Sequence, residues 1–303
     1  MQDARSSFTR RQLLALGSRA SASAVLLALS ERVAAQAPGR PARRMPVLFI
    51  GHGSPMNALQ DNPFTRHLNR LGQTLARPAA ILVVSAHWLT PGRTLVGVQA
   101  QPRTIHDFEG FPDALQRMQY PARGAPASAQ EAIGAVTSVP VAGSEDWGLD
   151  HGTWTVLHHL YPKADVPVFQ LSIDYPRPGR HHYAIGQELA ALRERGVLIV
   201  GSGNVVHNLR ATVQGAGDGL MASRPWAQAF DTAVQRALES RDDAALIDYP
   251  RLDASASMAV PTPDHYWPFL YALGAAGQDA RTVTTYAGFQ AGTISMRCLM
   301  WGA

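Results

Sequence analysis

The stretch "VLFIGHGSP", residues 47–55, is an apolar run that ends in a histidine between two glycines. Two other apolar runs end in a similar way, since "ILVVSAH" leads to His87 and "VLIVGSGNVVH" leads to His207. Continuously apolar runs are typical of strands that are covered on both faces. In sheets of parallel strands, ligands bind outside the carboxyl ends of the strands. If these three strands are parallel neighbours, we expect His52, His87 and His207 to meet at one edge of the sheet.

The rest of the sequence alternates between strand-like and helix-like patterns. Strands are expected at residues 45–51, 79–86, 94–100, 165–173, 196–203 and 281–288. Helices are expected between them, at residues 62–76, 128–136, 153–162, 180–196 and 224–241. This alternation predicts an α/β fold with a mainly parallel or mixed sheet and helices on both faces. We find no internal repeat, and we interpret residues 45–303 as one catalytic domain with a metal site at the carboxyl ends of its strands.

Composition excludes several classes of function. The chain has 303 residues, of which 46% are hydrophobic, so it can bury a sizeable core. Its net charge is +4, but residues 1–35 hold five arginines against two acidic residues, so the remainder is close to neutral. This distribution gives no support for nucleic-acid binding. Cys298 is the only cysteine, so any metal must be held by histidine and carboxylate.

The first 35 residues have the pattern of a secretory signal peptide. A basic start leads into a moderately apolar middle and a small-residue end at Ala35, and the pair Arg10-Arg11 indicates the twin-arginine route. Arg19 interrupts the apolar stretch, so we expect no stable membrane insertion. Residues 36–44 then form a linker. The prediction is a periplasmic protein, and the alternative is an uncleaved tail on a cytoplasmic one.

Three further segments place histidines in loops or at helix starts. In "PTPDHYWPFLY", residues 261–271, Asp264 fits a helix N-cap, which leaves His265 unexplained. In "TIHDFEGFP", residues 104–112, two phenylalanines accompany His106 and either line an aromatic-binding site or hold the loop to the core. In "DWGLDHGTW", residues 146–154, His151 immediately precedes a predicted helix.

A single histidine at a strand end is usually a hydrogen-bonded loop residue, but three at like positions favour a metal site. Neutral imidazole is a ligand for zinc, iron and copper, and two or three such ligands leave coordination positions open for chemistry. The sequence lacks a G-x-G-x-x-G motif after its first strand, a G-x-S-x-G elbow, an H-E-x-x-H motif and a Walker motif. These absences remove support for a dinucleotide fold, a serine hydrolase of the elbow type and a P-loop enzyme.

Seven motifs now make a family recognisable. In order along the chain they are "GHGSPM", "SAHW", "HDFEGFP", "DHGTW", "GSGNVVHNL", "PTPDHY" and "SMRCLMW". Over residues 45–303 the chain resembles the 4,5-DOPA extradiol dioxygenase family, within the class III extradiol ring-cleavage superfamily. The resemblance implies one mononuclear metal site per chain, with Fe(II) for activity, although members are often isolated with zinc. The implied substrates are a catechol and O₂, and the implied product is of the muconic semialdehyde type.

The resemblance also implies roles for individual residues. His52, His87 and His265 match metal ligands, and His207 matches a residue described as a ligand or as the active-site base. Asp264 is an alternative to His265 as the third ligand, because other branches of the superfamily use a carboxylate there. A mechanistic hypothesis beside the resemblance adds further candidates. His151 and His106 would orient the catechol hydroxyl or protonate an intermediate, and the candidates for a wall beside the aromatic ring are Phe108, Phe111, Tyr266 and Trp267.

Two other functions remain open at this point. A zinc-dependent hydrolase would use the same imidazoles to lower the pKa of a bound water. A non-catalytic binding protein on the same fold would keep the scaffold without ring cleavage. The identity of the catechol and the oligomeric state are also open.

Overall fold

The computed structural model describes residues 44–212, 217, 219–277 and 281–302. The predicted signal peptide, residues 1–35, and most of the linker lie outside the described residues. Among the described helices, none has the length and apolar character that crossing a bilayer requires.

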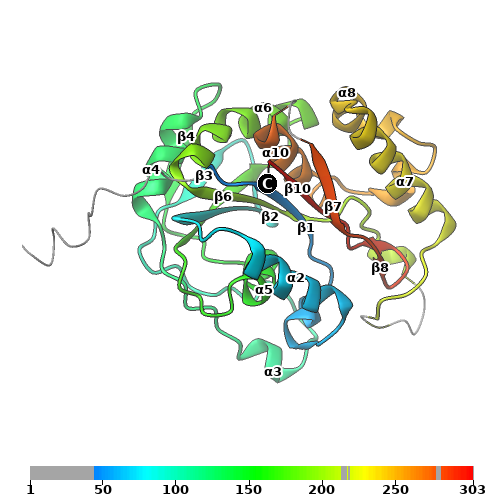
Figure 1. Cartoon of the computed structure of the whole chain (residues 1–303), viewed down its shortest axis with the longest axis horizontal. Helices are drawn as coiled ribbons and strands as arrows, with labels where there is room; N and C mark the ends of the chain where they lie inside the picture. Colours follow the sequence, from blue (N-terminus) through cyan, green and yellow to red (C-terminus); the bar gives the residue numbers. More distant parts are fainter. Residues whose placement is uncertain (1–43, 213–216, 218, 278–280, 303) are drawn as a thin grey trace, which may run out of the picture. The chain divides into compact units, whose positions relative to one another are not determined.

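The described residues form one eight-stranded mixed sheet in the order β4-β3-β5-β2-β6-β1-β10-β7, which confirms the predicted α/β fold (Figure 1). Four central strands, β5, β2, β6 and β1, run parallel, whereas β10 runs antiparallel to both of its neighbours. The strands are β1 (Val47–Gly51), β2 (Ala80–Thr90), β3 (Thr94–Gly97), β4 (Val141–Ser144), β5 (Val168–Asp174), β6 (Val197–Gly203), β7 (Thr282–Tyr286) and β10 (Cys298–Trp301). A separate two-stranded ribbon pairs β8 (Phe289–Gln290) with β9 (Ile294–Ser295).

Helices cover both faces of the sheet, as predicted (Figure 1). The α-helices are α2 (Pro63–Thr74), α3 (Asp113–Gln116), α4 (Pro126–Ala135), α5 (His151–Leu160), α6 (Gly179–Leu189), α7 (Pro225–Ser240), α8 (Asp243–Ile247), α9 (Ala256–Ala259) and α10 (Trp267–Ala276). Short 3₁₀ helices are η1 (Pro55–Leu59), η2 (Ala190–Arg195), η3 (Leu209–Ala211) and η4 (Tyr249–Arg251).

Strand β1 shows why the central strands are apolar throughout. Val47 and Phe49 belong to the core that α6 and α10 share, whereas Leu48 and Ile50 belong to the core that α2 and α5 share. Successive side chains of a strand point to opposite faces, so a strand with helices on both sides needs an apolar residue at every position.

The order β2-β6-β1 brings the three histidine-bearing strands side by side, with their carboxyl ends at the same edge. His52 follows β1 directly, and His207 follows the end of β6 by four residues. Strand β2 differs from the prediction, because it continues to Thr90. Its register shifts between Val84 and Leu89, so His87 lies in a bulged part of the strand rather than beyond its end.

Candidate active site

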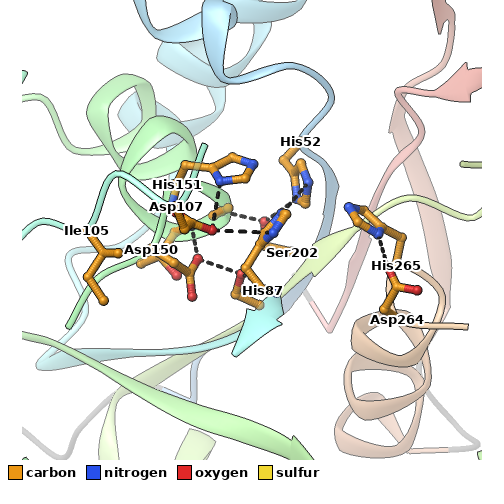
Figure 2. Close-up of polar contacts among 12 residues, drawn as sticks. His52, His87, Ile105, Asp107, Asp150, His151, Ser202, Asp264 and His265 are labelled. Carbon is orange, nitrogen blue, oxygen red and sulfur yellow. Dashed lines mark hydrogen bonds and ion pairs between the residues drawn. The ribbon is translucent and has the colours of Figure 1, made fainter. Parts of the chain in front are cut away.

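Three imidazoles from distant parts of the chain converge at this edge (Figure 2). They belong to His52 after β1, His87 in β2 and His265 just before α10. The Nε2 atoms of His52 and His87 are 3.3 Å apart. The ring of His265 has its centroid 5.3 Å from that of His52 and 5.1 Å from that of His87. One ring nitrogen from each of the three residues lies within 4.8 Å of the other two.

A hydrogen-bond chain determines which nitrogen of His52 carries the proton. Ser202 Oγ donates to the carbonyl oxygen of Gly152 at 2.5 Å, because a carbonyl only accepts. The same hydroxyl oxygen lies 3.0 Å from His52 Nδ1, and having used its own hydrogen it accepts from that nitrogen. His52 therefore carries its hydrogen on Nδ1, and its Nε2 lone pair faces His87.

Carboxylates hold the other two rings from behind. Asp264 accepts from Nδ1 of His265, and Asp107 lies 3.4 Å from Nδ1 of His87. In both rings Nδ1 faces a carboxylate, and Nε2 is the nitrogen left to face the other imidazoles. Asp264 therefore lies behind His265 rather than within the group of three. The N-cap interpretation of Asp264 was wrong, because α10 begins at Trp267 with no side-chain cap.

His52 and His87 are kept neutral by their surroundings. Burial, together with the neighbouring imidazoles, holds the pKa values of His52 and His87 well below the usual histidine value. Two nitrogens bound to one ion at about 2.1 Å each lie no more than about 4 Å apart. The Nε2 separation of His52 and His87 fits this limit. Three imidazoles backed by a hydroxyl and by carboxylates fit a divalent transition metal.

His151 and Asp107 form a second pair beside this group. Helix α5 begins at His151, because Asp150 accepts from the backbone N–H of Thr153 and caps the helix. Nδ1 of His151 lies 2.9 Å from Asp107 Oδ2, and its backbone N–H donates to Oδ1 at 2.9 Å. Burial alone would raise the pKa of Asp107, but these hydrogen bonds outweigh burial and hold it below the usual value. Sequence reasoning gave Asp107 no role, although it directly follows His106 in a motif that had been singled out.

His207 lies against His265 in a parallel stack, with ring centroids 3.5 Å apart and an angle of 4° between the planes. Among the described residues, its nitrogens are not part of the group of three. Burial and the neighbouring His265 hold the pKa of His207 well below its usual value, against the opposing effect of Asp264. His207 is therefore a neutral ring beside the candidate metal ligands.

A cavity of about 550 Å³ opens over the imidazoles. Its described lining includes the five residues His52, His87, His151, His207 and His265, together with Phe108 and Phe111. The two phenylalanine rings form a T-shaped pair at 5.2 Å, and Phe108 also meets the ring of His151 edge-on at 5.6 Å. The cavity thus has a polar floor and an aromatic wall, and its volume is typical of sites for small organic molecules.

Matches to known proteins show the family of this chain. The family model described as "Catalytic LigB subunit of aromatic ring-opening dioxygenase" matches residues 46–295. The chain belongs to the LigB family. It is an extradiol aromatic ring-opening dioxygenase and thus an oxidoreductase.

Relatives of this LigB-family chain include the "4,5-DOPA dioxygenase extradiol" of Escherichia coli K12. It is 47% identical over 265 residues, which cover 86% of this chain and 95% of the relative. The protein of the same name from Beta vulgaris is 37% identical and covers 82% of this chain and 92% of its own length. A crystal structure of an uncharacterized protein from E. coli K12 superposes with a TM-score of 0.74 at 41% identity, covering 86% of this chain and all of that one.

The structure places three of the predicted site residues away from the described lining of the cavity. These are His106, Tyr266 and Trp267. The ring of His106 is bonded elsewhere, since its Nε2 lies 2.9 Å from the carbonyl oxygen of Met118. Tyr266 is fully buried and donates to the carbonyl oxygen of Leu246, and the indole of Trp267 packs on a histidine of α6. Both aromatic side chains point into the core because α10 starts at this position.

Proposed function

We propose that this LigB-family chain is a metal-dependent enzyme that opens the ring of a substituted catechol outside the diol. One divalent metal, Fe(II) for activity, would be held by His52, His87 and His265. The observation that carries the proposal is the convergence of these three imidazoles, each with a nitrogen directed at the other two, on the floor of a cavity with an aromatic wall. The names of the relatives favour a DOPA-like catechol, with a muconic semialdehyde-type product.

A divalent metal held by these three imidazoles would supply Lewis acidity, which favours ionisation of a catechol hydroxyl. The chain's own residues supply the proton transfers. His207 is neutral and borders the cavity, so one of its ring nitrogens is available to accept the proton of the second hydroxyl. Its stacking on His265 holds the ring in place while it does so.

His151 is suited to orienting the diol. Asp107 Oδ2 lies 2.9 Å from Nδ1 of His151, so this side of the ring is held by the carboxylate. The other ring nitrogen, Nε2, is then left to contact a substrate hydroxyl. Phe108 meets the same ring edge-on and lines the cavity, where it would lie beside the aromatic substrate.

Oxygen consumption tests the proposal. The purified chain is loaded without oxygen with either Fe(II) or zinc, mixed with L-DOPA or another catechol, and then exposed to air. Oxygen uptake and a yellow ring-opened product are expected with Fe(II) and not with zinc. No uptake with any catechol, despite full iron loading, would rule the function out. The rival function is a zinc-dependent hydrolase. Such an enzyme would hydrolyse its substrate with zinc alone and would need no oxygen.

We also propose export by the twin-arginine route. The support is the pair Arg10-Arg11 ahead of an apolar stretch that ends in small residues. The full chain expressed in a bacterium with an active twin-arginine pathway is expected in the periplasmic fraction without residues 1–35. Replacement of both arginines by lysine should retain it in the cytoplasm, and a periplasmic variant would contradict this route.

A further inference from the structure

The first turn of α5 lies behind the proposed metal ligands. Asp150 caps this turn and is fully buried, and Gly152 is the second residue of the helix. Neither belongs to the described lining of the cavity, in contrast to His151 between them. Hydrogen bonds connect both residues to the segments that carry His52 and His87 (Figure 2).

The carboxylate of Asp150 accepts hydrogen bonds at both of its oxygens. Oδ1 accepts from the hydroxyl of Ser85 at 2.6 Å and from the backbone N–H of Thr153 at 3.2 Å. Oδ2 accepts from the side-chain amide of Gln170 at 2.7 Å and from the indole N–H of Trp147 at 3.2 Å. The carboxylate therefore joins β2, β5, α5 and the loop before α5 at one buried point.

Ser85 connects Asp150 to His87. The ladder between β2 and β5 has no pairs at residues 85–88, where β2 is bulged. The backbone N–H of His87 instead donates to Ser85 Oγ at 3.3 Å, while the hydrogen of that hydroxyl is donated to Asp150. The backbone of His87 is thus held by Ser85, and the orientation of the Ser85 hydroxyl is set by Asp150.

Gly152 contacts both of the segments that carry these ligands. Its carbonyl oxygen accepts from Ser202 Oγ, and that hydroxyl oxygen lies 3.0 Å from Nδ1 of His52. A Cβ atom at this position would lie 2.9 Å from Cδ2 of His87 and 2.5 Å from Oγ of Ser85. Both distances are shorter than van der Waals contact, so only glycine lets the turn pack this closely against the ring of His87.

We propose that the first turn of α5 is the positioning element of this site. Asp150 positions His87 through Ser85, and Gly152 positions His52 through its carbonyl and His87 through the space that it leaves for the ring. The inference rests on the proposed function because it takes these two histidines as metal ligands. Asp150 and Gly152 are positioning residues, because they act on the metal through other side chains.

A matched pair of substitutions around Asp150 tests its role. Ser85→Ala and Trp147→Phe each remove one donor to the carboxylate, but only Ser85 is bonded to His87. Partners behind a metal ligand typically contribute about 10- to 100-fold in metal affinity, so Ser85→Ala should weaken Co(II) binding about tenfold or more. Trp147→Phe keeps a ring to stack on Trp88 and should bind Co(II) as the wild type does. Wild-type affinity in Ser85→Ala, or an equal loss in Trp147→Phe, would overturn the role of Asp150.

Asp150→Asn tests the carboxylate directly. Each of its oxygens accepts from two donors, so the NH₂ group of the amide must oppose one of these pairs. Co(II) affinity should fall at least as far as in Ser85→Ala. Wild-type affinity in Asp150→Asn would contradict the proposal, and if this variant does not fold, Ser85→Ala still decides.

Gly152→Ala tests the close approach to His87. Alanine favours a helix more than glycine does, so the substitution by itself should not weaken α5. The added methyl group must displace the ring of His87, so Co(II) affinity should again fall about tenfold or more. Gly134→Ala in α4 makes the same change where a Cβ meets nothing within 4 Å, and affinity should stay unchanged. Unchanged affinity in Gly152→Ala would overturn the role of Gly152.

The visible spectrum of the Co(II)-loaded protein separates positioning from stability. Its d–d bands depend on the arrangement of the ligands and are recorded on folded, metal-saturated protein. The bands should shift in Asp150→Asn, Ser85→Ala and Gly152→Ala and match the wild type in both controls. Wild-type bands in all three variants would show that the turn contributes stability only, and the inference would be wrong. Neither measurement needs turnover, so a wild type that opens no catechol would count against the proposed function alone.

Discussion

Asp107 and His151 are joined by two contacts, since Nδ1 of His151 lies 2.9 Å from Oδ2 of Asp107 and the backbone N–H of His151 donates to Oδ1. His151 is the first residue of α5, so the carboxylate also lies at the positive end of a helix. The same Oδ2 faces His87 Nδ1 at 3.4 Å. One carboxylate thus orients a candidate metal ligand and the ring proposed to bind the diol.

Replacing Asp107 by asparagine should weaken both functions. Oδ2 of Asp107 faces both imidazoles and Oδ1 accepts from the backbone N–H of His151, so the single oxygen of the amide cannot serve both sides and its NH₂ group must oppose an N–H on one of them. Because partners behind a metal ligand typically contribute about 10- to 100-fold in metal affinity or activity, we expect losses of that size for Asp107→Asn. Metal affinity from chelator competition and kcat for a catechol measure the two effects separately.

The matched control is Asp113→Asn, at the start of α3 on the same segment. Its carboxylate is almost fully exposed and, within the described part of the chain, its ion pair is with the exposed Arg117, so neither quantity should change. Wild-type metal affinity and kcat in Asp107→Asn would show that the carboxylate orients neither ring.

Substitutions at the stacked pair His265 and His207 should separate metal binding from proton transfer. His265→Ala removes one of three converging nitrogens, so metal retention after dialysis should be lost. His207 lies outside that group, so His207→Ala should retain most of the metal while kcat falls by about 10²- to 10⁴-fold, the typical range for a general base.

Elemental analysis measures the retained metal, and oxygen uptake measures kcat. The control is His158→Gln, near the other end of α5, which should change neither quantity. Loss of metal in His207→Ala would make His207 a ligand.

The comparison of sequence with structure explains what could be predicted for this site. The histidines at 52, 87 and 207 follow apolar runs, and parallel strands bring such positions to one edge whatever the details of packing. Ser202 and Asp107 were not predicted, because their partners lie 150 and 44 residues away and the contacts depend on tertiary packing. Strand β10 was missed because a four-residue apolar run has no distinguishing periodicity.

Tyr266 and Trp267 show that the direction of a side chain is also hard to predict from sequence. They were assigned to the substrate wall because they adjoin His265 in sequence, yet the backbone becomes helical there and turns their side chains toward Leu246 and α6. At the start of a helix, neighbours in sequence point their side chains in different directions, because successive side chains are rotated by about 100° around the helix axis.

The buried pair Arg297 and Asp231 should be important for stability. The guanidinium donates from Nε at 3.0 Å and from Nη2 to the two carboxylate oxygens, and both side chains are at least 95% buried. Asp231→Asn leaves the buried cation without its partner, which typically costs about 3–5 kcal/mol. Urea unfolding measures this cost. Asp248→Asn, which breaks an exposed pair with Arg251 at 3.7 Å, should cost less than about 1 kcal/mol. Equal costs for the two variants would contradict the prediction.

His182 should make stability depend on pH independently of the metal site. The ring is fully buried between the hydroxyl of Tyr271, 3.1 Å from Nδ1, and the carbonyl oxygen of Arg177, 3.1 Å from Nε2. Burial, with a smaller effect from His181, lowers the pKa of His182 to about 3. In the unfolded chain a histidine has a pKa of about 6.5. Below that pH the unfolded chain takes up a proton that the folded protein does not, so this stabilisation is complete above about pH 6.5 and declines as the pH falls toward 3.

The decline has a slope of about 1.4 kcal/mol per pH unit, or about 2 kcal/mol between pH 6.5 and pH 5. His182→Gln removes this titration, while the other histidines titrate alike in both proteins and cancel in the difference. Free energies of unfolding are measured in urea, with a chelator present, at about pH 7 and about pH 5. The advantage of the wild type should shrink by about 2 kcal/mol at the lower pH. If it stays constant or grows, the folded protein accepts the proton at His182, and burial does not keep this ring neutral.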